Sequence, residues 1–325
     1  MSDSNDELMM ETMYWWGIPT LFRCENNKNI DECDIVLAGV PHSTGNGTTE
    51  RDQHLGPRAV RHVSAGLRRV HLDFNINPWK KKKVFDLGDV ALPHANNNER
   101  CIEDITNFYT KIANSKKPVV SIGGDHSITG GILQGLGSNN LEMTKGKKIS
   151  FLHIDAHTDT FTQLDHFMGA KKSAAHWGAY LVDQGIIDPK TSMQIGMRGN
   201  PRSLDWLQPS YDLGYNVVTM EEFQKRGMKD VIDQTLEKIG DNPVYITFDL
   251  DSLDATVAPA VSNIEPGFTG FTIDEAKTLI QSVKNKNVIG GDVVCLMPTK
   301  DHKNNITSMV AASIMFEIIS VIAYK

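Results

Sequence analysis

The sequence is poor in cysteine and holds no pair of cysteines at metal-binding spacing. Its 325 residues include four cysteines, namely Cys24, Cys33, Cys101 and Cys295, and no two of them form a CxxC pair. Cysteines so widely spaced argue against a disulfide scaffold and against a cysteine-based zinc site. They are typical of a reducing compartment, and we expect a cytoplasmic protein.

The chain also lacks a net positive charge and a secretion signal. The net charge is −7, and the lysines and arginines are scattered apart from one run at residues 80–83, so nucleic acid is not expected as a partner. The first residues, MSDSNDELMMETMYWW, are acidic and polar and lack the basic and apolar regions of a signal peptide. We therefore expect no export.

Only one stretch, Ile306–Tyr324, approaches the length of a membrane span. Glu317 lies inside it, and three serines interrupt it. This composition favours a buried C-terminal core helix over a membrane segment.

What the sequence does have is a regular alternation of apolar strands and helical patterns. This alternation predicts a three-layer α/β/α fold with an eight-stranded, mostly parallel sheet. No composition break marks a linker, so we expect residues 1–325 to form a single domain, with residues 1–30 as an N-terminal arm. The expected strands are 35–40, 84–86, 119–122, 149–154, 192–195, 217–219, 244–249 and 288–294. The expected helices are 57–65, 99–113, 228–239, 273–283 and the C-terminal stretch after Asn305.

Polar side chains follow three of the expected strands, at the point where each strand ends. One strand runs into GGDHS with His126, the next into DAHTD with Asp155, His157 and Asp159, and a third into DLD with Asp249 and Asp251. Alternate residues of an extended chain share a face, and the carboxyl ends of parallel strands meet at one edge of the sheet. The six side chains are therefore expected to converge.

Four carboxylates packed together would repel one another unless cations lay between them. Two divalent ions carry about the compensating charge, and mixed nitrogen and oxygen ligands suit transition metals better than calcium or magnesium. A single DxD or GGDH could instead be a turn or a helix cap, but the three motifs together favour a metal centre.

These motifs, GGDHS, IDAHTD and FDLDSLDATVAPA, resemble the signatures of the ureohydrolase family, which includes arginases and agmatinases. The stretches GIPTLFR, GVP, GPRAVR and QIGMRG resemble agmatinase-like members, so the resemblance covers roughly residues 15–325. It implies an arginase-like fold and two divalent ions, Ni²⁺ or Mn²⁺, held by His126, Asp155, His157, Asp159, Asp249 and Asp251. It also implies that a hydroxide bridging the ions attacks a guanidine carbon, and that Asp159 passes a proton to the leaving amine.

The sequence departs from the family pattern at the position of a proton-shuttling histidine. That position falls on Ala174, and His176 is displaced from it by two residues. His176 either takes over the catalytic and substrate-binding role or forms a different part of the pocket wall.

A second departure concerns the glutamate that pairs with the substrate guanidinium in the family, because Cys295 stands in its place. A neutral thiol cannot form a bidentate ion pair, so we expect poor binding of agmatine or arginine. Cys295, His176, Trp177 and Phe268 are the expected substrate contacts, and they suit an N-alkylated guanidine or a biguanide. In this respect the chain resembles the nickel-using members that act on guanidine and on metformin. The alternative is that Cys295 only fills space and that Glu265 or Asp165 supplies the charge.

Other functions remain open. The chain could be an agmatinase or guanidinobutyrase type of enzyme, a non-catalytic paralogue that assembles with an active subunit, or a metal-dependent amide hydrolase. The family resemblance also implies a trimer or hexamer, possibly one that contains a paralogous subunit.

Overall fold

One central β-sheet runs through the molecule, and the helices pack around it. The structure, a computed structural model, describes residues 13, 16–47, 51–137, 143–164, 167, 169–265 and 269–325. Within these residues, nine strands form one sheet in the order β1-β3-β2-β4-β9-β8-β5-β6-β7, and every pairing between them is parallel. The strands are β1 (Glu25–Asn26), β2 (Ile35–Gly39), β3 (Val84–Asp89), β4 (Val119–Ile122), β5 (Ser150–Ile154), β6 (Met193–Met197), β7 (Asn216–Thr219), β8 (Pro243–Asp249) and β9 (Asn287–Val294).

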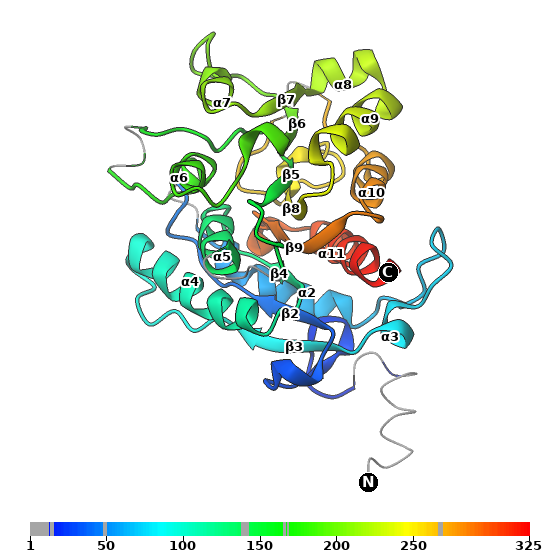
Figure 1. The fold of residues 1–325 in the computed structure, drawn as a ribbon. Helices are drawn as coiled ribbons and strands as arrows, with labels where there is room; N and C mark the ends of the chain where they lie inside the picture. The colour runs from blue at the N-terminus through cyan, green and yellow to red at the C-terminus, as the bar shows by residue number, and fades with distance from the viewer. Residues whose placement is uncertain are drawn as a thin grey trace.

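Helices cover both faces of this sheet, which confirms the predicted three-layer α/β/α fold (Figure 1). One face carries α4 (Asn98–Asn114), α5 (Ser127–Gly137) and α6 (Trp177–Asp183), and the other carries α2 (Gly56–Ser64), α9 (Met228–Ile239), α10 (Ile273–Ser282) and α11 (Ile306–Tyr324). The short helices α3 (Pro78–Lys81), α7 (Gln208–Leu213) and α8 (Met220–Arg226) lie toward the margins. Two hydrophobic cores result, one on each face.

All eight predicted strands are present, and the number was wrong by one because β1 was missed. Its two residues are exposed, so no apolar pattern marks them. The strand nevertheless pairs with β3, and Leu21 and Phe22 just before it are buried. This part of the predicted N-terminal arm therefore packs against the chain's own sheet.

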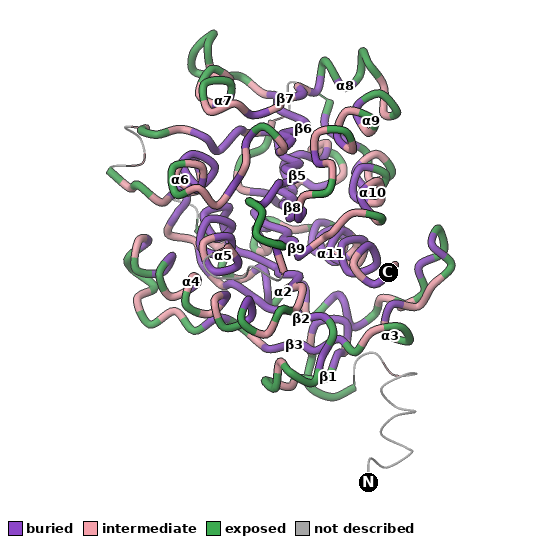
Figure 2. Tube along the Cα trace, in the orientation of Figure 1, coloured by how far each residue is buried: buried purple, intermediate pink, exposed green. Residues whose placement is uncertain are grey.

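Burial also confirms the prediction for the C-terminal stretch. The helix α11 is apolar and long enough to cross a membrane, but 72% of its most apolar part is buried inside the fold. It packs against α2, α10 and β9 and is largely buried in Figure 2. Its one acid, Glu317, accepts hydrogen bonds from His71 and Gln281, which compensates its burial.

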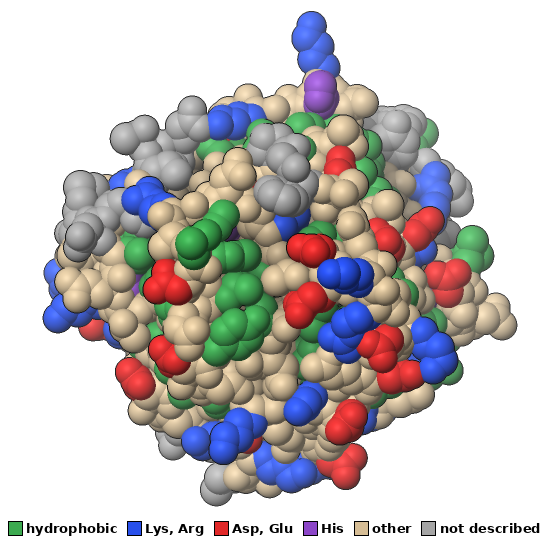
Figure 3. All heavy atoms as spheres, turned by 90° about the horizontal axis from the view of Figure 1, so that it is seen from above, with side chains coloured by type: hydrophobic (Ala, Val, Ile, Leu, Met, Phe, Trp, Pro, Cys, Tyr) green, Lys and Arg blue, Asp and Glu red, His purple; other side chains and the backbone are tan. Residues whose placement is uncertain are grey.

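On the molecular face seen in Figure 3, charged side chains of both signs are interspersed.

One buried ion pair ties the N-terminal segment to the sheet, and its loss should destabilise the fold. Asp86 is fully buried. Its carboxylate accepts a hydrogen bond from the amide of Leu21 at 2.8 Å and two from Arg61 at 3.0 and 3.1 Å. We expect Asp86→Ala to lower the free energy of unfolding by about 3 kcal/mol, because it removes two hydrogen bonds from the largely buried Arg61 and leaves the buried amide of Leu21 without its acceptor. The matched control is Asp89→Ala, since Asp89 also pairs with Arg61 but is 41% exposed, and it should cost under about 1 kcal/mol. Urea denaturation measures both, and equal losses would contradict this account.

Candidate metal centre

The three motif-bearing strand ends meet because of the strand order. β4, β8 and β5 lie close together, with β9 between β4 and β8, so their carboxyl ends form one short edge. At this edge, His126 Nδ1 lies 2.9 Å from an oxygen of Asp155, 2.9 Å from one of Asp159 and 3.2 Å from one of Asp249. The predicted convergence is therefore present for this half of the centre.

The second predicted histidine ligand, His157, lies close to Asp155 and to the last predicted ligand, Asp251. His157 Nδ1 lies 3.4 Å from the other oxygen of Asp155 and 3.2 Å from Asp251 Oδ2. Asp155 thus offers one oxygen to each histidine and links the two halves. All six predicted ligands belong to one continuous cluster.

The turn that aims His126 inward depends on glycine. A side chain on Gly124 would come within 1.6 Å of the carbonyl oxygen of His42, so the chain could not pass there with any other residue. Asp125, between this glycine and His126, is fully buried and holds the turn. Its carboxylate accepts from the amide of Gly45 and from the amide and hydroxyl of Ser127. Asp125 therefore supports the turn and is no ligand.

Asp159 is held from two sides in an unusual backbone conformation. Its φ of 52° lies in the left-handed region, which costs free energy for a residue other than glycine. The indole of Trp177 donates to Asp159 Oδ2 at 3.0 Å, and the amide of Gly178 donates to its carbonyl at 2.9 Å. Trp177, predicted to contact substrate, is fully buried and lies behind Asp159.

The residues present fit a pair of metal ions. The side chains of the four aspartates are at most 11% exposed, and the described residues bring no lysine or arginine among them as an ion-pair partner. His126 Nδ1 and Asp251 Oδ2 are buried and have no partner of hydrogen-bond geometry in the described part of the chain. Nitrogen and oxygen atoms buried in this way are normally hydrogen-bonded or coordinated to metal. The cluster therefore has the chemistry of a metal site.

Metal uptake should compete with protons at the two histidines. Burial alone would lower the pKa of His126, but Asp155 and Asp159 raise it well above its ordinary value; Asp251 and Asp155 raise that of His157 in the same way. Protons and metal ions therefore compete for the two rings. We expect metal affinity to rise from pH 6.5 to 8.5, by roughly tenfold per pH unit for each proton displaced. Chelator competition across this range measures the slope, and an affinity independent of pH would contradict the assignment.

A cavity of about 610 Å³ opens over the cluster. Its floor includes His126, His157, Asp159, Asp249 and Asp251. One wall is apolar and partly aromatic, formed by Phe161, Leu164, Phe167, Trp206 and Ile264. The cavity therefore combines an acidic floor, which attracts a cation, with an apolar wall, and Arg198 and Arg202 also line it.

The other predicted substrate contacts differ in where they lie relative to the cavity. Cys295 lines the cavity and has a left-handed φ of 69°, and its role as a substrate contact stays a prediction. Ala174 also lines it, whereas His176 is buried beside the wall, bonded through Nδ1 to Ser173 and in edge contact with Phe167. The catalytic and substrate-binding role of His176 stays a prediction. Phe268 and Asp165 lie outside the described residues.

Sequence reasoning missed the side chains that support the ligands. His153 donates from Nε2 to Asp155 at 2.7 Å, because Gln194 donates to its other nitrogen and fixes the tautomer. Glu265 bonds His157 Nε2 at 3.0 Å. The signal for His153 was available, since it lies two residues before Asp155 on the same face of β5.

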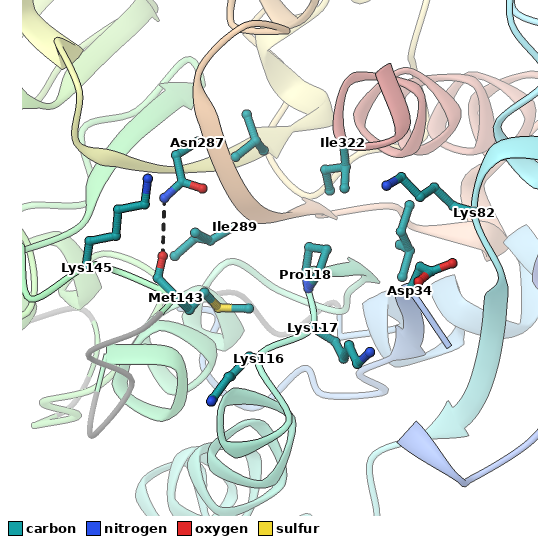
Figure 4. A pocket seen from close by; sticks show the side chains of 12 residues that line it. Asp34, Lys82, Lys116, Lys117, Pro118, Met143, Lys145, Asn287, Ile289 and Ile322 are labelled. Atoms are coloured by element: carbon teal, nitrogen blue, oxygen red, sulfur yellow. Dashed lines mark hydrogen bonds between the residues drawn. The ribbon is translucent and has the colours of Figure 1, made fainter. Parts of the chain in front are cut away.

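A second cavity, of about 430 Å³, lies at the opposite, amino edge of the sheet. Figure 4 shows Lys82, Lys116, Lys117 and Lys145 around it, and among the described residues that line it Asp34 is the one acid. Positive charge of this kind disfavours a cationic substrate. Of the two cavities, the one above the carboxylates is therefore the candidate site.

A parallel α/β sheet with a buried His–Asp cluster at its carboxyl edge is typical of a metal-dependent enzyme. Comparison with known proteins gives the family: the model described as "Arginase family" matches residues 33–320, and the chain belongs to this family. It is 32% identical to human mitochondrial guanidino acid hydrolase over 93% of this chain and 82% of that protein. It is 30% identical to guanidinopropionase of Pseudomonas aeruginosa over 94% of this chain and 92% of that protein. Among solved structures, proclavaminate amidino hydrolase from Streptomyces clavuligerus superposes with a TM-score of 0.85 at 28% identity, covering 96% of this chain and 99% of that chain.

These findings confirm the ureohydrolase prediction at the level of the family. The chain is a hydrolase that acts on linear amidines, and its His–Asp cluster is the binuclear metal site of this family.

Proposed function

We propose that this ureohydrolase acts on an N-alkylated guanidine or a biguanide of the metformin type, in preference to agmatine. The observation that carries the proposal is Cys295, which is buried against the centre and lines the cavity. Burial, together with the charges of Asp249 and Asp251, raises the pKa of this thiol well above its ordinary value. The thiol is therefore neutral and offers no carboxylate to a primary guanidinium.

The nearby acid, Glu265, is already engaged by a metal ligand. Glu265 lines the cavity, but its carboxylate is bonded to His157 at 3.0 Å and so supports a metal ligand. The apolar wall beside it favours alkyl groups and delocalised charge, because aromatic faces attract diffuse cations and apolar contact favours methyl groups. An alkylated substrate uses both features.

The arrangement of side chains supports a hydrolytic mechanism. Two divalent ions held by His126, Asp155, His157, Asp159, Asp249 and Asp251 would lower the pKa of water and so supply a nucleophilic hydroxide near neutral pH. The chain binds the guanidine-type group over the acidic floor, and the apolar wall excludes water from it. Asp159, fixed by Trp177, accepts the proton of the nucleophile and returns it to the departing amine, so that an amine and a urea-type product leave.

The test is a substrate panel with metal controlled. The purified chain, reconstituted with Ni²⁺ or Mn²⁺, is assayed for amine and urea-type release from dimethylguanidine, metformin, guanidine, agmatine, arginine and guanidinobutyrate. We expect an alkylated guanidine or biguanide to give the highest kcat/KM. A clear preference for agmatine or for a guanidino acid would reject the proposal.

The second candidate is an agmatinase or guanidino acid hydrolase type of activity. Arg202 lies on the cavity wall and is exposed there, where it would meet the carboxylate of a guanidino acid. The names of the relatives favour the same candidate. An Arg202→Gln variant separates the two, because only a guanidino acid should lose affinity.

A non-catalytic role beside a paralogous subunit has less support, since such a chain would not need six ligands in one centre. Metal content measured on the chain alone tests it. The trimeric or hexameric state, the choice of Ni²⁺ or Mn²⁺ and the cytoplasmic location stay predictions.

A further inference from the structure

A carboxylate deep in the sheet, Asp292 on β9, is bonded by hydroxyl groups alone. It is fully buried and accepts from Thr129 at 2.9 Å, from Tyr245 at 2.9 Å and from Thr247 at 2.7 Å. No lysine or arginine pairs with it within the residues described. A buried charge without such a partner is costly, so the arrangement calls for a reason beyond packing.

Thr247 connects this carboxylate to the metal centre. Parallel pairing of β8 and β9 places Thr247 directly opposite Asp292. The same hydroxyl lies 2.8 Å from Nε2 of His126, on the side of the ring that faces away from the other ligands. Thr247 also precedes the ligand Asp249 by two residues, so both project from the same face of β8.

Counting protons fixes the direction of each bond. A threonine hydroxyl has one proton, and in its bond to Asp292 that proton is donated to the carboxylate. The oxygen of Thr247 must then accept from His126, which requires a proton on Nε2. In the neutral ring this leaves a lone pair on Nδ1, the atom that faces Asp155 and Asp159 without a hydrogen-bond partner.

We infer that Asp292 is a positioning residue of the metal centre, which acts through Thr247 to hold His126 in the tautomer that can bind a metal. The inference deepens the site described above and does not depend on which substrate it takes. Partners of this kind orient the ring and increase the basicity of the coordinating nitrogen. Their removal typically weakens metal binding by about 10- to 100-fold.

The variants that test this inference differ in a single group. Thr247→Val keeps the branched shape but removes the hydroxyl from the path, and Thr247→Ser keeps the hydroxyl. Tyr245→Phe is the matched control, because it removes one donor to Asp292 that is not on the path to His126. Asp292→Asn replaces the carboxylate that accepts from Thr247 by an amide.

The readout is the dissociation constant of Mn²⁺ or Ni²⁺, measured by chelator competition, with the melting temperature of each metal-free variant as the fold control. We expect Thr247→Val and Asp292→Asn to bind metal about 10- to 100-fold more weakly, while Thr247→Ser and Tyr245→Phe stay within about threefold. Thr247→Val binding metal within threefold of the unaltered protein would overturn the inference. So would an equal loss in Tyr245→Phe, which would show a general effect on the core. Because no substrate is involved, this outcome is independent of the proposed function.

Discussion

Replacing Asp155 by alanine should abolish hydrolysis and remove bound metal. Asp155 is fully buried, and its two oxygens lie 2.9 Å from Nδ1 of His126 and 3.4 Å from Nδ1 of His157. Among the described residues it is the one carboxylate that faces both histidines, so its loss affects both ion positions. A loss of about 4 kcal/mol of transition-state stabilisation corresponds to roughly a 1,000-fold fall in kcat/KM, and we expect at least that.

The matched control for this variant is Asp233→Ala. Asp233 is 60% exposed on α9 and pairs only with the exposed Lys229. It should keep its metal and its activity. Metal content and turnover measured on the same samples decide the matter, and an Asp155→Ala protein that retains both ions with normal turnover would reject the assignment of the centre.

The second large effect concerns specificity. We expect Cys295→Glu to raise kcat/KM for agmatine by about 10- to 100-fold, because a charge-assisted hydrogen bond to a primary guanidinium contributes roughly 1.5–3 kcal/mol. The same variant should lose activity toward an alkylated substrate, which it would crowd and which offers fewer N–H donors. The cavity gives the new side chain direct access to substrate, since Cys295 already lines it.

Cys295→Gln separates charge from size in this experiment. Glutamine has nearly the shape of glutamate but cannot form an ion pair, so it should bring no gain with agmatine. Steady-state kinetics of both variants on agmatine and dimethylguanidine give the comparison. Equal changes in the two variants would mean that bulk at this position, and not charge, governs the choice of substrate.

Much of the fold could be predicted because its strands are buried on both faces. β2, β4, β5 and β8 read as continuous apolar runs, and burial of every residue in them explains why. The helix α5 was missed for a physical reason. It contains Gly130, Gly131 and Gly135, which lower helix propensity but allow α4 and α6 to approach closely. Tertiary packing decides such a helix, and one sequence does not display it.

The metal ligands could be predicted because they directly follow strands, and those in DAHTD and DLD are spaced by two residues. Their supporting partners could not, because these depend on which strands are neighbours and in what register. Asp292 contacts Thr247 only because β9 lies beside β8 with these two residues opposite each other. Cys295 was found through the family pattern. The displacement of His176 was found in the same way, but its position beside the cavity wall depends on how the loop before α6 packs.

The measurement that tests the account most directly is the number of metal ions bound per chain. The purified protein, loaded with Mn²⁺ or Ni²⁺ and freed of excess ion, should hold about two ions per chain by elemental analysis. It should release a urea-type product only in that state. A chain that binds no metal at neutral pH, or that hydrolyses guanidine compounds equally well after complete chelation, would contradict the central claim.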